Sequence, residues 1–257
     1  MKQFSLNLKD NSQDQIQWLK PSELSEDHPR FLIKIAAEDS FTRRFEVVGG
    51  QCGGPFLSVV ASLTGYPEKF ARILKGHKIR DGHLHFNFYT SPGNLKSIKI
   101  DNRLPSIDGK LIYAKAPNDI YWCAFLEKAY AGYLGDYNEV EKVSPEDAIF
   151  HLTGLKSSYS PLKHASPVGL YEKLSQAIGQ ESVVLLITAD NKCSTVTGIR
   201  KTSSRRQMMH LETEIRANVS ENGSFEERWM KFDEFQQMFQ HLYISKPEKR
   251  LCKTCGQ

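Results

Sequence analysis

The chain has 257 residues and a mass of 29.3 kDa, enough for one large domain or two small ones. Hydrophobic residues make up 40% of it and charged residues 25%, a balance typical of folded proteins rather than disordered ones. The net charge of +4 is too small to indicate a nucleic-acid partner. The longest apolar run, 183–187, is far shorter than the ~20 residues of a membrane span.

Cysteine usage predicts a reducing compartment. The five cysteines (Cys52, Cys123, Cys193, Cys252 and Cys255) are odd in number and scattered along the chain. No apolar run that could act as a signal peptide lies near the start, so we expect a cytoplasmic protein. Cys252 and Cys255 have the spacing of half a zinc site, and a closed structural site needs four ligands.

The predicted folded part begins after a polar segment, 1–15. A glycine-rich turn over 49–55 leads into a helix in which Phe56, Val59 and Leu63 fall at helical spacing. Because this helix is apolar on nearly every side, we expect it to be buried.

Two strands are predicted next, over 83–89 and 95–100, because apolar and polar side chains alternate along both. A Pro-Gly turn joins them. The rest of this half is predicted as a strand over 111–114 and helices over 121–130 and 144–152. We expect Trp122 of the first of these helices to be buried against the helix that follows Pro55.

The composition changes after Gly154. The segment 156–166 is rich in serine and proline, which predicts a linker or crossover. Beyond it we predict helices over 169–178 and 232–239 and strands over 183–188, 193–200, 211–217 and 242–245. A helix-rich half followed by a strand-rich half indicates an α+β protein with two subdomains and a cleft between them.

Several segments resemble the protease core of the calpain family, in the same order. Residues 122–131, WCAFLEKAYA, are similar to the family's W-x-x-x-L-E-K-A-Y-A helix. Residues 101–111 are similar to its D-x-R-L-P and D-G-x-L signature. Further similar segments are QWLKPSEL at 17–24, FLSVVASLT at 56–64, GHLHFNF at 82–88, VTG at 196–198 and WMKF at 229–232.

The resemblance covers about residues 16–246 and implies a papain-like core of two subdomains. It divides the chain into a flexible N-terminus, a nucleophile-side subdomain, a shortened histidine- and asparagine-side subdomain, and a tail. These parts are expected at 1–15, 16–154, 155–250 and 251–257.

A papain-type protease needs a thiolate nucleophile, a histidine that takes its proton, an amide that orients the histidine, and donors for the oxyanion. When the family motifs are matched, Gly54 occupies the nucleophile position and Val48 that of the oxyanion-hole glutamine. Lys192 occupies the histidine position and Ala217 the asparagine position. Glycine has no nucleophile and a lysine ammonium is no base, so the resemblance implies a catalytically deficient member, used as a binding or regulatory module.

The alternative is an active, calcium-dependent cysteine endopeptidase that uses Cys52. This thiol lies two residues before the expected position, in a glycine-rich loop before a helix, where a thiol pKa is lowered. Its candidate partners His151, His164 and His210 fall at none of the family's histidine positions.

Calcium is the second function that the resemblance implies, because the family binds it in each subdomain. Phe45 and Ile120 occupy two of the acidic positions, with Glu46 and Asp119 adjacent to them. Glu227 matches an acidic ligand of the second subdomain. These three carboxylates are the candidate ligands of a site that needs 6–8 oxygen atoms.

The resemblance also implies protein partners, either the substrates of an active calpain or a cytoskeletal or ciliary assembly. Asp101 and Arg103 could be mistaken for a catalytic pair, and we expect them to form an internal ion pair that holds a loop. His83 and His85 alternate outward on a strand and are expected to be solvated.

Overall fold

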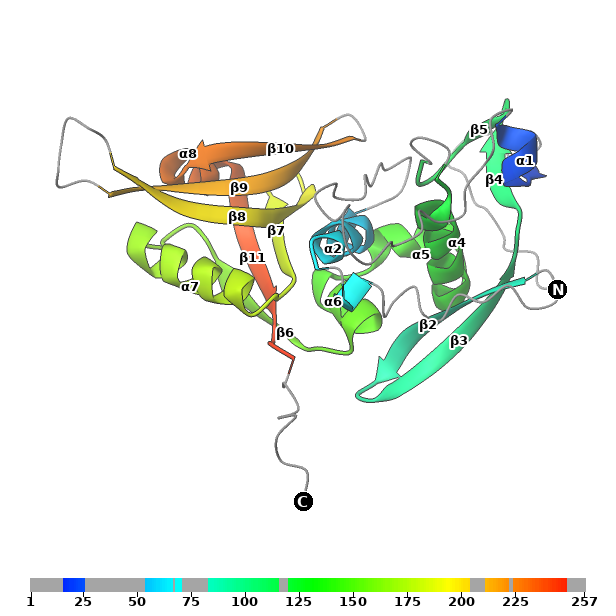
Figure 1. The fold of residues 1–257 in the computed structure, drawn as a ribbon, viewed down its shortest axis with the longest axis horizontal. Coiled ribbons are helices and arrows are strands. Elements are labelled where there is room, and N and C mark those ends of the chain that lie inside the picture. The colour runs from blue at the N-terminus through cyan, green and yellow to red at the C-terminus, as the bar shows by residue number, and fades with distance from the viewer. Residues whose placement is uncertain are drawn as a thin grey trace, which may run out of the picture.

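The computed structural model describes residues 16–25, 54–66, 68–70, 83–115, 120–203, 211–221 and 224–248. Helices dominate the half that precedes Gly154, and one large antiparallel sheet dominates the half that follows it (Figure 1). The predicted α+β class is therefore confirmed. Within the described ranges no helix is both long enough and apolar enough to cross a membrane.

The first half is built around a fully buried helix, α2 (Gly54–Thr64), in which every residue from Pro55 onward is buried. The predicted hairpin is formed by β2 (His83–Ser91) and β3 (Asn94–Asp101), and its buried apolar side chains, Leu84, Phe86, Phe88, Ile98 and Ile100, lie on one face. The other elements are β1 (Gln17–Leu19), α1 (Pro21–Leu24), β4 (Leu104–Ile107), β5 (Lys110–Leu111), α4 (Trp122–Leu134), α5 (Tyr137–Lys142) and α6 (Pro145–Thr153).

Aromatic side chains of α4 form much of the first core. Trp122 is buried, but its ring meets Phe70 edge-on, with centroids 4.9 Å apart. Two turns further along α4, Tyr130 stacks on Phe56 of α2, with ring centroids 4.3 Å apart. The burial of Trp122 is as predicted.

The second half is a six-stranded antiparallel sheet with two helices. Its strand order is β10-β9-β8-β7-β11-β6. The elements are β6 (Ser157–Pro161), α7 (Pro167–Gly179), β7 (Val184–Thr188), β8 (Cys193–Ser203), β9 (Leu211–Glu221), β10 (Ser224–Lys231), α8 (Phe232–Met238) and β11 (Phe239–Ser245).

Strand β7 joins the two halves because both of its faces are buried. Val184 and Leu186 point into a second core that includes residues of α7 and α8. Leu185, between them, points into the first core. Neighbouring residues of β7 enter different cores because successive side chains of a strand point to opposite faces. Helix α2 packs against β7 and β8. Helix α2 thus lies at the junction of the two halves (Figure 1).

Two sequence-based assignments were wrong. The strand predicted over 111–114 ends at Leu111. The backbone N–H of Ala114 donates to the Glu127 carboxylate at 2.7 Å and so makes no hydrogen bond to a neighbouring strand. The segment predicted as a linker contains β6, which pairs with β11 at the edge of the sheet. An edge strand tolerates proline, and this explains why its composition resembles that of a loop.

The loop after β3 is held, but not by the predicted pair. The buried Lys128 ammonium donates to Asp101 Oδ1 at 2.5 Å and to the Arg103 carbonyl at 2.6 Å. Arg103 contributes its backbone N–H to Asp101 Oδ1, at 3.0 Å. Lys128 also lies 5.0 Å from the centre of the Trp18 ring. The ion-pair partner of Asp101 is thus the lysine of the L-E-K-A-Y-A helix.

Helix α6 ends at Gly154 in a left-handed conformation, with φ +71°. A Cβ atom there would lie 2.7 Å from Cε1 of Tyr89, closer than real Cβ atoms approach carbon. Gly93, in the hairpin turn, has a similar φ of +80°, and in the described part of the chain no non-neighbouring atom lies within 4 Å of its Cβ position.

We expect Gly154→Ala to destabilise the protein more than Gly93→Ala does. Both changes carry the cost of a positive φ, about 1–2 kcal/mol. Gly154→Ala adds overpacking against the Tyr89 ring, typically ~1–3 kcal/mol. Urea unfolding of both variants measures the difference. Equal midpoints would show that the Tyr89 ring moves aside without cost.

Candidate functional site

Gly54, which the motifs assign to the nucleophile position, is the first residue of α2. Its φ of +32° lies in the region that L-amino-acid side chains rarely adopt. A Cβ atom there would meet only the Glu141 carbonyl oxygen, at 4.0 Å, among the described residues. The position therefore has space for a side chain, whereas its backbone conformation favours glycine.

Lys192, which the motifs assign to the histidine position, belongs to the turn between β7 and β8. Its backbone N–H donates to Thr188 Oγ1 at 2.9 Å, and its carbonyl accepts the N–H of Thr188 at 3.0 Å. Its ammonium lies 2.9 Å from Asp190 Oδ2, and its side chain is 64% exposed. The hydrogen bonds of Thr188 and Lys192 lower the pKa of Asp190 to about 2. The backbone of Lys192 thus helps to close the turn, and its exposed ammonium places a positive charge on the surface of the protein.

Ala217, which the motifs assign to the asparagine position, lies in β9 opposite Val196 of β8. Lys192 precedes Val196 by four residues, about 13 Å along an extended strand. The sheet register therefore does not bring Lys192 and Ala217 together. Continuing the register from the pair Thr195 and Asn218 leads from Lys192 to Glu221, the last residue of β9.

Only some of the other predicted site residues lie in the part of the chain that the structure describes. Glu227 lies in β10, where its backbone pairs with Asn218. Among the described residues, no group of three or more histidine, cysteine or acidic residues is arranged to hold a metal ion. Val48, Cys52, Glu46, Asp119, Cys252 and Cys255 lie outside the described residues.

The described cysteines and one of the histidines have structural surroundings. Burial raises the pKa of Cys193 to about 12 and that of Cys123 well above its ordinary value. Neither thiol is a nucleophile near neutral pH, because the thiolate is the reactive form. His151 shares a hydrogen bond of 2.8 Å with the Tyr130 hydroxyl, and burial lowers its pKa.

The fold and the sequence together define a class of protein. Residues 1–211 match the family described as calpain family cysteine protease, so the chain belongs to that family. The two halves joined along α2 are accordingly a calpain protease core, as the motifs predict.

Individual calpains are similar to the chain at low identity. Calpain-A of Drosophila melanogaster is 31% identical over 175 residues, covering 66% of this chain and 20% of that protein. Calpain-13 of Rattus norvegicus is 27% identical over 276 residues, covering 89% of this chain and 40% of that protein. The Calpain-2 catalytic subunit of Mus musculus is 25% identical over 277 residues, with 89% and 38% covered. The chain thus spans less than half the length of these relatives.

Proposed function

We propose that this chain is a calpain-family pseudoprotease, a protease fold that binds or regulates proteins without cleaving peptide bonds. The observation that carries the proposal is Gly54. It stands at the start of the buried helix where the family's nucleophile is expected, and it offers no side chain to attack a carbonyl. Its φ of +32° favours glycine there, so the backbone matches the residue that is present.

The charges and the register of the second half support the same conclusion. The Lys192 ammonium is paired with Asp190 and cannot accept a proton from a thiol. Ala217 has no amide to orient a base. A catalytic triad acts as a unit, so the absence of all three groups removes the chemistry more surely than the absence of one.

The partners, the compartment and the domain division belong to the same proposal. We infer protein partners, among the substrates of an active calpain or in a cytoskeletal or ciliary assembly, by family analogy. Scattered cysteines favour the cytoplasm. The junction at Gly154, between the last helix of the first half and the first strand of the sheet, supports subdomains over 16–154 and 155–250. Calcium binding through Glu46, Asp119 or Glu227 would be a separate property.

We expect no hydrolysis of casein or of a calpain peptide substrate by the purified chain, with or without millimolar calcium. The physical reason is that no nucleophile stands at position 54 and no base at position 192. An active calpain, assayed in parallel, shows that the conditions support turnover. Hydrolysis by the wild type that Cys52→Ser abolishes and Cys123→Ser leaves intact would instead establish the chain as a cysteine endopeptidase using Cys52.

A further inference from the structure

The first strand of the second half, β6, carries a serine close to the surface. β6 lies at the edge of the six-stranded sheet, and among the described strands it pairs with β11 alone. Within it Tyr159 is 50% exposed and Ser160 is partly exposed, and Pro161 beside them is exposed. A strand with one partner separates from its sheet at lower cost than an inner strand. An enzyme that modifies side chains can therefore reach this segment.

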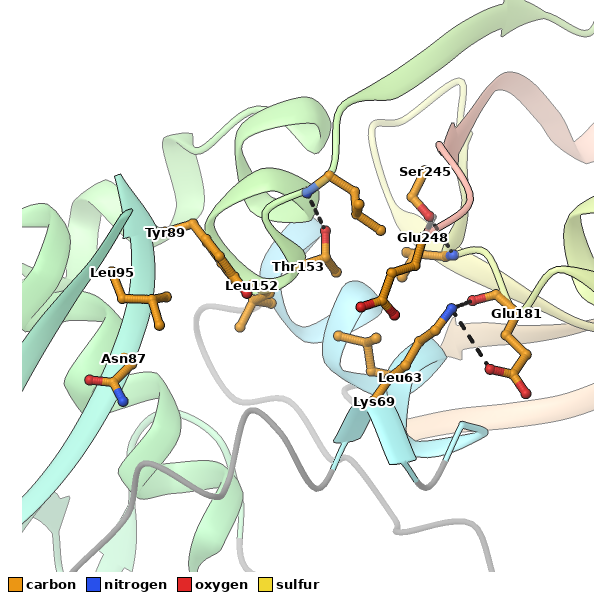
Figure 2. A pocket seen from close by; sticks show the side chains of 12 residues that line it. Leu63, Lys69, Asn87, Tyr89, Leu95, Leu152, Thr153, Glu181, Ser245 and Glu248 are labelled. Carbon is orange, nitrogen blue, oxygen red and sulfur yellow. Dashed lines mark hydrogen bonds and ion pairs between the residues drawn. The ribbon is translucent and has the colours of Figure 1, made fainter. Parts of the chain in front are cut away.

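The chain is held in place on both sides of β6. Before the strand, the Leu155 N–H donates to Thr153 Oγ1 at 3.1 Å, at the end of α6 (Figure 2). After the strand, the Gln236 amide of α8 donates to the carbonyl oxygens of Leu162, at 2.7 Å, and Lys163, at 3.3 Å. These bonds anchor the chain at two points, and the backbone between them stays extended.

The side chain of Ser160 points toward α7. Its Oγ accepts a hydrogen bond from the ammonium of Lys173, an exposed residue of that helix. A phosphate on this oxygen would therefore lie against an ammonium that already reaches it. Hydrogen bonds between an ammonium and a phosphate are charge-assisted and stronger than neutral ones. The surroundings of Ser160 thus favour a phosphorylated side chain.

The sequence around Ser160 has the pattern that proline-directed protein kinases accept. Pro161 follows the serine, and Lys163 occupies the third position after it. Proline fixes φ near −65° and has no N–H that would need a partner in the kinase. A basic residue at the third position adds charge complementarity to an acidic kinase surface. Ser166 is also followed by proline, but its third position is Gly169, and its Oγ accepts the Gly169 N–H at 3.1 Å.

We propose that Ser160 is a phosphorylation site for a proline-directed protein kinase. Ser160 Oγ forms a bond to the γ-phosphorus of ATP, the bond from that phosphorus to the bridging oxygen breaks, and ADP leaves. The hydroxyl proton passes to the catalytic base of the kinase. The phosphate adds a charge of about −1.5 to −2 at pH 7, and Lys173 pairs with it and links β6 to α7. The inference does not depend on the loss of proteolysis.

Incubation of the whole chain with a cyclin-dependent kinase and magnesium ATP tests the site, and mass spectrometry locates the phosphate. We expect Ser160 to be phosphorylated faster than Ser166. Lys163→Ala should slow the phosphorylation of Ser160 by about fivefold, the range of one exposed ion pair. Lys156→Ala, which removes an exposed lysine before the serine, is the matched control and should leave the rate unchanged.

Phosphorus NMR of the phosphorylated protein tests the contact with Lys173. Phosphoserine loses its second proton with a pKa of about 6, and the Lys173 ammonium should lower this pKa by a few tenths. In phosphorylated Lys173→Met the pKa should return to that of a phosphoserine peptide. A kinase reaction that leaves Ser160 without phosphate, or that Lys163→Ala does not slow, would overturn the proposal. So would the same phosphate pKa with and without Lys173.

Discussion

Trp122→Ala is expected to lower the free energy of unfolding by about 3–5 kcal/mol, the usual cost of truncating a buried tryptophan. The side chain is 2% exposed and packs edge-on against Phe70. Since a domain has only ~5–15 kcal/mol of stability, the variant should unfold or melt many degrees below the wild type. Thermal melts followed by circular dichroism measure the change.

Two variants serve as controls for Trp122→Ala. Trp229→Ala removes a tryptophan that is 36% exposed, and Gly54→Ala places a methyl group whose nearest non-neighbouring atom, among the described residues, is 4.0 Å away. We expect both to melt closer to the wild type, with Gly54→Ala costing about 1–2 kcal/mol through its positive φ. A Trp122→Ala protein that melts like Trp229→Ala would contradict the packing of α4 described above.

The hairpin and α2 of the first half could be predicted because local patterns coincide with tertiary burial. Buried and less buried side chains alternate along 83–89, and α2 is buried on all sides, so the sequence period and the burial agree. Local patterns did not predict strand β6, nor strand β1, which pairs with β4 over three residues. Ser157–Pro161 becomes a strand only because β11 offers it a partner, and this long-range pairing leaves no local signal.

The sequence predicts which residues belong to the candidate site, but it does not predict the distances between them. Motif spacing assigns Gly54 to the nucleophile position and Lys192 to the histidine position, and both assignments stay predictions. The distance between Lys192 and Ala217 depends on the register of β8 and β9, which the sequence does not reveal. Likewise, the partner of Asp101 is Lys128, 27 residues away. The available signal was a Glu-Lys pair inside an otherwise apolar helix, which indicates buried charges that need partners.

Glu127, the other member of that pair, is fully buried beside Lys128. Its Oε2 accepts the Ala114 N–H, and its Oε1 has no hydrogen-bond partner among the described residues. Burial raises the pKa of Glu127 to about 8, although the Ala114 N–H and the nearby Lys115 ammonium favour the charged form. The folded protein therefore keeps this carboxyl protonated under conditions in which the unfolded chain has released the proton.

A pKa that is higher in the folded state makes stability fall as pH rises. Below the ordinary value of 4.5 both states carry the proton, and above about 8 neither does. Between these limits Glu127 should lower the free energy of unfolding by at most about 1.4 kcal/mol per pH unit. Glutamine at this position keeps an acceptor for the Ala114 N–H and cannot ionise.

We therefore expect Glu127→Gln to be as stable as the wild type near pH 5 and more stable, on the order of a few kcal/mol, near pH 8. Urea unfolding of both proteins across this range gives the difference, in which the titration of all other groups cancels. Glu172→Gln, at an exposed site on α7, should run parallel to the wild type. If the curves of Glu127→Gln and the wild type also ran parallel, Glu127 would be ionised in the folded protein, and a buried cation such as Lys115 would have to compensate its charge.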